Sequence, residues 1–93
     1  MGVDNPMVLV KSSEAVFRVV DGEAVIVEPR NGMVNVLSGV GTRIWELLDG
    51  ARNVSEIAGI LQDEYEVSRE QAESDAREFL EDLKSKGLVH VKN

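Results

Sequence analysis

The stretch from residue 33 to residue 50, MVNVLSGVGTRIWELLDG, constrains the fold most because it changes from strand pattern to helix pattern within a few residues. Its first five residues are mostly β-branched or apolar, as in a short strand. From Val40 the apolar residues recur at helical spacing, and we expect the Ser38 hydroxyl to cap the first turn. Asp49-Gly50 ends the helical pattern. The sequence therefore predicts sheet before this stretch and helix after it.

Three segments of strand character occupy the first part of the chain, at residues 15–20, 23–28 and 33–37. The dipeptide Asp21-Gly22 between the first two favours a tight hairpin. We therefore expect an antiparallel meander whose second strand is central, with the first or third strand offering an open edge. Three short strands are about the minimum that survives when another layer packs on one face.

Two further helices are predicted after residue 50. Residues 53–56 (NVSE) and 68–71 (SREQ) both fit capping boxes, and an apolar stripe at helical spacing follows each. The second of these helices is the longest and runs from Ser68 to about Lys86. The element order predicts an α+β domain with a winged-helix-like arrangement, in which a three-stranded antiparallel N-terminal sheet packs on three helices.

The two ends of the chain are less regular. We expect residues 1–7 to form a flexible arm and residues 8–93 to form one domain. Residues 7–10 are expected to be an edge strand or a segment packed across the core. Residues 88–91 are expected to be a short final strand or a segment lying on the core.

Composition limits the function classes. The 93 residues carry a net charge of −7, with no cysteine and one histidine. An acidic surface repels nucleic-acid phosphates and anionic lipid, so neither nucleic acid nor membrane is an expected partner. The apolar runs are too short to cross a bilayer, and the N-terminus lacks a signal-peptide pattern, so a cytoplasmic location is expected.

Catalytic and metal-binding patterns are missing from the sequence. His90 has no partner at a useful spacing, and the serines lie in caps, turns or helix surfaces. The acidic run Asp63, Glu64 and Glu66 does not fit the alternating oxygen ligands of a calcium loop. We therefore expect no enzymatic activity, no metal and no cofactor.

Several binding or structural functions remain open on architecture alone. A winged-helix DNA-binding or regulatory domain is the alternative function, although three acids and one arginine in residues 68–75 speak against a DNA-contacting helix. A carrier domain would need a helix-start serine that follows aspartate, whereas Ser38 follows leucine. A self-associating structural domain and a domain that captures a peptide on an edge strand are the remaining possibilities.

An ordered set of residues resembles the PqqD-like family. It comprises Asp21-Gly22-Glu23, Ile44 to Gly50 (IWELLDG), Asp75, Phe79-Leu80 and Gly87-Leu88, and the likeness spans about residues 8–91. The resemblance implies a recognition element that binds the leader of a ribosomally made precursor peptide. Such an element presents the leader to a maturation enzyme, for example a radical-SAM enzyme in pyrroloquinoline quinone synthesis or another peptide-modifying enzyme.

The family also implies a place for the peptide. The leader would add as a strand along the third strand, in a cleft walled by the longest helix. Helical spacing places Ala72, Ala76, Phe79 and Leu83 at the centre of the core, Asp75 and Asp82 on one flank of that helix, and Glu73, Arg77 and Leu80 on the other. The family favours the Asp75 side. The residues that we expect to bind peptide are Met33, Val34, Asn35, Val36, Leu37, Asp75, Phe79 and Asp82.

One departure from the family concerns the turn into the third strand. Many members have aromatic residues just after the turn glycine, whereas this chain has Met33-Val34. We therefore expect a flexible aliphatic pocket at this point of the cleft.

Overall fold

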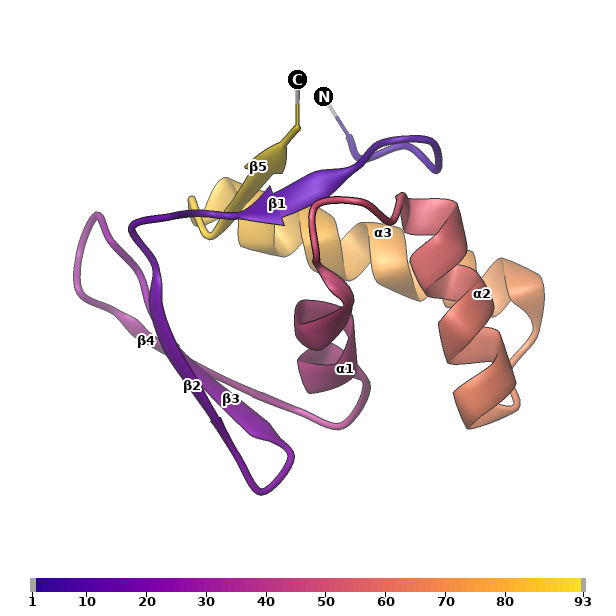
Figure 1. Ribbon diagram of the computed structural model, residues 1–93, viewed down its shortest axis with the longest axis horizontal. Helices are drawn as coiled ribbons and strands as arrows, with labels where there is room; N and C mark the ends of the chain where they lie inside the picture. Colours follow the sequence, from indigo (N-terminus) through magenta and orange to yellow (C-terminus); the bar gives the residue numbers. More distant parts are fainter. Residues whose placement is uncertain (1, 93) are drawn as a thin grey trace.

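Residues 2–92 are described by a computed structural model, in which three helices follow four strands and a fifth strand ends the chain (Figure 1). The α+β class and the three predicted helices are confirmed. The elements are β1 (Leu9–Lys11), β2 (Val16–Val20), β3 (Glu23–Val27), β4 (Val34–Ser38), α1 (Val40–Leu47), α2 (Val54–Tyr65), α3 (Arg69–Ser85) and β5 (Val89–Val91).

The predicted meander is the three-stranded antiparallel sheet β2-β3-β4. Asp21 and Gly22 both take positive φ angles, of 52° and 78°, and join β2 to β3 as a two-residue hairpin. This backbone suits the right-handed twist of paired strands, and glycine adopts it without steric cost. The sheet stands at one end of the molecule, with α1 between it and α2 (Figure 1).

The two ends of the chain form a second sheet that was not predicted. β1 and β5 pair antiparallel, with Leu9 opposite Val91 and Lys11 opposite Val89. Both segments had been expected as a strand or as chain lying on the core, and the structure makes both of them strands. Their pairing joins segments about eighty positions apart in the sequence, and Leu9, Leu88 and Val89 are buried beneath it.

One predicted capping box forms in full, and the other forms in half, because the Gln71 side chain bonds to Asp75 and not to the Ser68 N–H. Asn53 and Glu56 form the predicted reciprocal capping box, and the Ser68 hydroxyl accepts a hydrogen bond from the Gln71 N–H. The expected cap at Ser38 is wrong. Ser38 is the last residue of β4, and Gly39 precedes α1 with a φ of 55° and no side-chain cap. Strand pairing therefore continues one residue further than the helix pattern suggested.

One aliphatic core joins the layers. Trp45 of α1 is fully buried, and the Phe17 ring from β2 meets it edge to face with centroids 5.1 Å apart. The Lys11 ammonium lies 5.1 Å from the Phe17 ring centroid and 5.2 Å from that of Trp45. Burial lowers the pKa of Lys11, and the nearby carboxylates of Glu46 and Asp49 oppose that shift.

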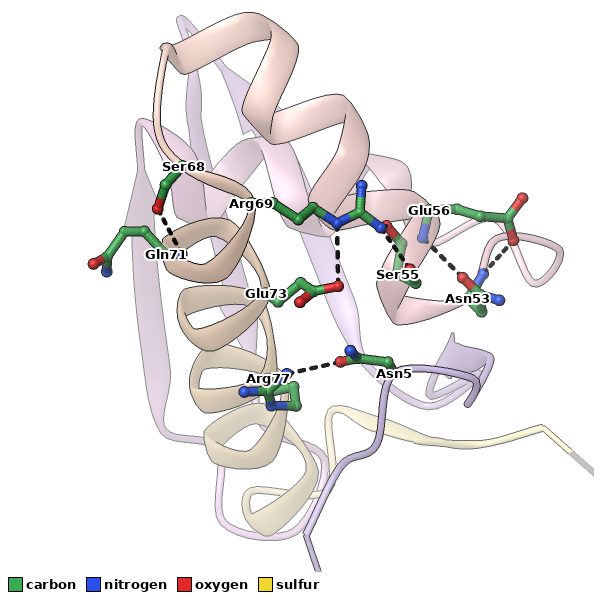
Figure 2. Close-up of polar contacts among 9 residues, drawn as sticks. All are labelled: Asn5, Asn53, Ser55, Glu56, Ser68, Arg69, Gln71, Glu73 and Arg77. Carbon is green, nitrogen blue, oxygen red and sulfur yellow. Dashed lines mark hydrogen bonds and ion pairs between the residues drawn. The ribbon is translucent and has the colours of Figure 1, made fainter.

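Residues 2–7, the segment for which we expect a flexible arm from sequence, contact α2 and α3. The Val3 side chain is only 2% exposed, and its N–H donates to Glu81 Oε1 at 2.9 Å. Arg77 of α3 donates to Asn5 Oδ1 at 2.8 Å (Figure 2). The Asn5 carbonyl accepts from the Ser55 N–H. Glycine, proline and polar residues suggest a loose segment, and a single buried valine and a few hydrogen bonds connect it to the helices.

Within residues 2–92, no helix has both the length and the apolar character that crossing a membrane requires.

Candidate functional site

The free edge of β4 is the first component of the site. Sheet order places β4 at one edge and β2 at the other, so β4 pairs with β3 on one side only within the described residues. Side chains alternate along β4. Val34 and Val36 are 60% and 61% exposed, whereas Asn35 and Leu37 are partly buried on the face toward the helices.

The register shows which backbone groups point away from the sheet. The Glu28 N–H donates to the Met33 carbonyl at 2.8 Å, so this carbonyl points toward the strand that precedes Glu28, which is β3. In an antiparallel ladder this orientation alternates, which turns Asn35 and Leu37 toward β3 as well. The N–H and C=O groups of Val34 and Val36 therefore point outward. An added strand would bond to these two residues.

A hollow on α3 is the second component. Its volume is about 510 Å³, and it is lined by Asp75, Glu78, Phe79 and Asp82, which share one stripe of the helix. The Phe79 ring connects this stripe to β4. A Cβ atom at Gly41 would lie 3.2 Å from Phe79 Cε1 and 3.7 Å from Leu37 Cβ. The glycine thus leaves room for the ring beside the end of β4.

A polar chain joins β4 to the last turn of α3. Asn35 Nδ2 donates to Glu28 Oε2 at 2.7 Å, and Lys86 Nζ donates to Asn35 Oδ1 at 3.0 Å. The Lys86 ammonium also pairs with Asp82 Oδ2 at 3.0 Å. Glu28 is only 8% exposed, and its buried carboxylate holds the Asn35 side-chain amide in one orientation. We call the surface made by β4 and the hollow on α3 the groove, and it is apolar near Phe79 and polar near Lys86.

Charged side chains on the other flank of α3 bond to neighbouring elements, and a second hollow of about 460 Å³, lined by Gly2, Glu81, Lys84 and Ser85, lies near the C-terminal end of that flank. Arg69 donates to Glu73 at 3.1 Å and reaches Ser55 of α2, while Arg77 donates to Asn5 (Figure 2). Glu81 accepts from the Val3 N–H. Sequence reasoning had left the choice of flank open, with a preference for the Asp75 side. The hollow lined by Phe79 lies on the Asp75 side.

The structure brings the predicted site residues to two facing elements. Asn35 and Leu37 line the helix-facing side of β4, and Asp75, Phe79 and Asp82 line the hollow. Met33, Val34 and Val36 are exposed, and the two valines contribute outward backbone groups. Whether these residues bind peptide remains a prediction.

One placement on α3 is corrected. Helical spacing had put Phe79 at the centre of the core and Leu80 on the flank. In the structure Leu80 is fully buried with Ala72, Ala76 and Leu83, whereas Phe79 is partly buried at the edge of the hollow. Adjacent residues on a helix are 100° apart, so a modest rotation of the apolar stripe exchanges their roles.

Two residues of the groove were missed from sequence. Glu78 lines the hollow one turn after Asp75, and a stripe at spacings of three and four from Asp75 would have included it. Lys86 was read as a helix-end cation, and its contact with Asn35 joins positions 51 apart. No local sequence pattern predicts that contact.

The residues along β4 and the α3 hollow offer apolar surface and hydrogen-bonding groups. No cluster of three or more possible metal-ligating side chains occurs in residues 2–92. The exposed stripe of α3 carries three carboxylates, from Asp75, Glu78 and Asp82, and such a face repels nucleic-acid phosphates. The winged-helix DNA-binding alternative therefore finds no support in this helix.

Residues 23–89 match the protein family described as Coenzyme PQQ synthesis protein D (PqqD). The chain belongs to the PqqD family. The match covers most of the meander and all three helices, including the α3 stripe and β4. No curated protein sequence matches the chain.

Three solved structures share the fold. TbiB1 in complex with the TbiA(β) leader peptide is 34% identical, with a TM-score of 0.81, over 87% of this chain and 94% of that one. A lasso peptide synthetase B1 complexed with the leader peptide is 25% identical, with a TM-score of 0.80, over 89% and 98%. The PqqD part of Methylobacterium extorquens PqqCD, described as a stand-alone RiPP recognition element, is 22% identical, with a TM-score of 0.77, over 95% and 94%. The last of these likenesses concerns the fold alone.

Proposed function

We propose that this chain is a non-catalytic adaptor that binds the leader of a ribosomally made precursor peptide and presents it to a separate maturation enzyme. The peptide adds as a strand to β4, within the groove beside α3. The enzyme is a radical-SAM enzyme or another peptide-modifying enzyme. Holding the leader raises the effective concentration of the peptide near that enzyme, and no residue of this chain takes part in the chemistry.

The observation that carries this proposal is the open edge of β4 beside the α3 hollow. Strand addition satisfies the outward N–H and C=O groups of Val34 and Val36, which supply affinity without reading sequence. The side chains of Asn35, Leu37 and Phe79 supply the pockets. Two relatives at 34% and 25% identity are complexes with leader peptides, which supports a peptide ligand for this chain.

We expect the peptide to run antiparallel to β4. Every strand pair in residues 2–92 is antiparallel, and antiparallel pairs outnumber parallel ones in proteins generally. Each hydrogen bond to the edge contributes only about 0.5–1.5 kcal/mol net, so one or two side-chain anchors must dominate the affinity. Phe79 is the natural anchor because its ring is large and only partly covered.

The test is amide hydrogen exchange, measured by NMR on labelled chain with and without the TbiA(β) leader peptide. Peptide addition should slow exchange at the amides of Val34 and Val36, which are the outward groups. Amides of Asn35 and Leu37 already bond to β3, so they should change little.

The alternation of outward-pointing and inward-pointing amides along β4 provides the control. Uniform protection along residues 34–37 would indicate general stabilisation instead of strand addition. Protection confined to β2, or to helix surfaces away from α3, would refute the β4 site.

A further inference from the structure

We propose that the groove reads two positions of the leader, spaced two residues apart. An apolar side chain lies against Phe79 and Leu37, and a neutral hydrogen-bond acceptor, such as an asparagine or glutamine side chain, lies against Lys86 and Asn35. This inference rests on the proposed function, since it names the sequence class that the β4 groove accepts.

The spacing follows from the pleat of β4. Asn35 and Leu37 are two residues apart and face α3, so an added strand also turns every second side chain toward α3. One inward side chain lies opposite Leu37, near the Phe79 ring. In an antiparallel peptide, the side chain opposite Asn35 comes two residues later and meets Lys86. The predicted peptide motif is therefore an apolar residue, then any residue, then a residue whose side chain accepts a hydrogen bond.

The hydrogen bonds at the polar end leave donors available. Lys86 has three N–H donors, of which Asn35 and Asp82 take two. The Asn35 amide has two N–H donors, and Glu28 takes one. Two donors thus remain on adjacent side chains between β4 and α3. Because an unmet donor in a covered groove costs free energy, the peptide side chain that enters should carry an acceptor.

Local charge decides between a neutral and an ionised acceptor. The polar end holds the Lys86 ammonium and two carboxylates, Glu28 and Asp82, and the Arg30 guanidinium lies beside Gly87, the residue after Lys86. Asp75 and Glu78 add further negative charge along the same groove. A peptide carboxylate would compete with Asp82 for Lys86 and would face this excess of like charge. An amide side chain offers the same acceptor without the repulsion.

The experiment compares three peptides on three forms of the chain. Intermolecular NOEs to Asn35 first identify the residue of the TbiA(β) leader that lies opposite it. That residue is replaced by glutamine, glutamate or leucine, and dissociation constants are measured by calorimetry. The wild-type chain should bind the glutamine peptide about fivefold more tightly than either other peptide, roughly the contribution of one hydrogen bond.

Two variants separate the contributions. Lys86→Met should reduce the preference for the glutamine peptide over the leucine peptide, because the Lys86 donor and its charge are lost while the free Asn35 donor remains. Asp82→Asn should reduce or reverse the preference for glutamine over glutamate, because Lys86 is then free to pair with the peptide carboxylate. Asp63→Asn, which removes a carboxylate from the exposed surface of α2, is the matched control and should leave both ratios unchanged.

The outcomes are distinguishable from failure of the proposed function. Three peptides of equal affinity, with protection of Val34 and Val36 retained, would overturn the two-position reading while the β4 site stands. Tighter binding of glutamate than glutamine to the wild-type chain would overturn the charge argument. No protection of β4 by any peptide would refute the proposed function itself. Thermal unfolding of each variant verifies that the fold is intact.

Discussion

The two flanks of α3 carry similar side chains and use them differently. On one flank, Glu81 and Arg77 bind residues 2–7, and Glu73 is linked through Arg69 to α2. On the other flank, Asp75 accepts from Gln71 and Asp82 pairs with Lys86, both within about one turn of the same helical segment. The charged residues Glu73, Arg77 and Glu81 of the first flank connect elements, whereas the Asp75 and Asp82 carboxylates of the second flank bond within α3 and its end, and Lys86 alone of that group reaches β4.

This difference teaches that charge content alone does not locate a binding surface on a helix. A flank whose polar groups join other elements contributes to the fold. A flank whose polar groups find only neighbours on their own helix keeps its surface available to a ligand. The adjacent residues Leu80 and Phe79 show the same division among apolar side chains, since one is in the core and the other borders the hollow.

The largest expected effect separates Leu80 from Phe79. Leu80→Ala should lower the free energy of unfolding by about 2–5 kcal/mol, because it leaves a cavity in the core. Phe79→Ala should cost less stability, because part of the ring is already exposed, but should weaken leader binding strongly. Urea unfolding and calorimetric titration measure the two quantities. A larger stability loss for Phe79→Ala would reverse the assignment of core and groove.

The next effect concerns the β4 edge. Val36→Pro removes an outward N–H and places a ring at the edge, so leader affinity should fall at least about tenfold. The ladder to β3 does not use that N–H, and the thermal midpoint should change little. Asn35→Pro is the contrasting variant, because it removes an N–H from the ladder and should unfold the sheet. Equal behaviour of the two variants would contradict the derived alternation.

A smaller effect contrasts charges on the two flanks. Arg77→Ala should cost about 0.5–1.5 kcal/mol of stability through its lost bond to Asn5, with leader affinity unchanged. Asp75→Asn should leave stability unchanged and weaken a lysine-containing leader about two- to fivefold at low salt, with the difference fading as salt is raised. Chemical unfolding and titrations at two salt concentrations test the pair. A loss of stability in Asp75→Asn would contradict the proposed difference between the two flanks of α3.

The smallest effect tests another ion pair that joins two elements. Arg43 of α1 donates twice to Glu64 of α2, at 2.8 Å each, and this hydrogen bonding holds the pKa of Glu64 below its ordinary 4.5. A carboxylate with a lowered folded-state pKa stabilises the fold above its unfolded-state pKa. That contribution is lost as pH falls through the lower folded-state value. The thermal midpoint of the wild type should therefore exceed that of Glu64→Gln slightly at pH 7, and the gap should close below about pH 4.5. A gap that widens in acid would contradict this origin.

Local sequence chemistry explains the features that were predicted correctly. The Asp21-Gly22 hairpin and the Asn53–Glu56 capping box depend on residues next to each other in the chain. The pairing of β1 with β5 was missed because it joins distant segments that carry no turn signal between them. The Asn35–Lys86 contact escaped notice for the same reason. The register of the sheet was not assigned from sequence, and it determines which edge groups point outward.

The pairing of β1 with β5 has a consequence for how this domain joins other proteins. Leu9 lies opposite Val91, so the chain enters and leaves the fold at the same place, and Figure 1 shows both termini at the end of the molecule away from the β2–β3 hairpin. A linker attached at either end does not need to cross the β4 edge. A chain segment that continued from β1 or β5 would therefore leave the backbone edge of β4 uncovered.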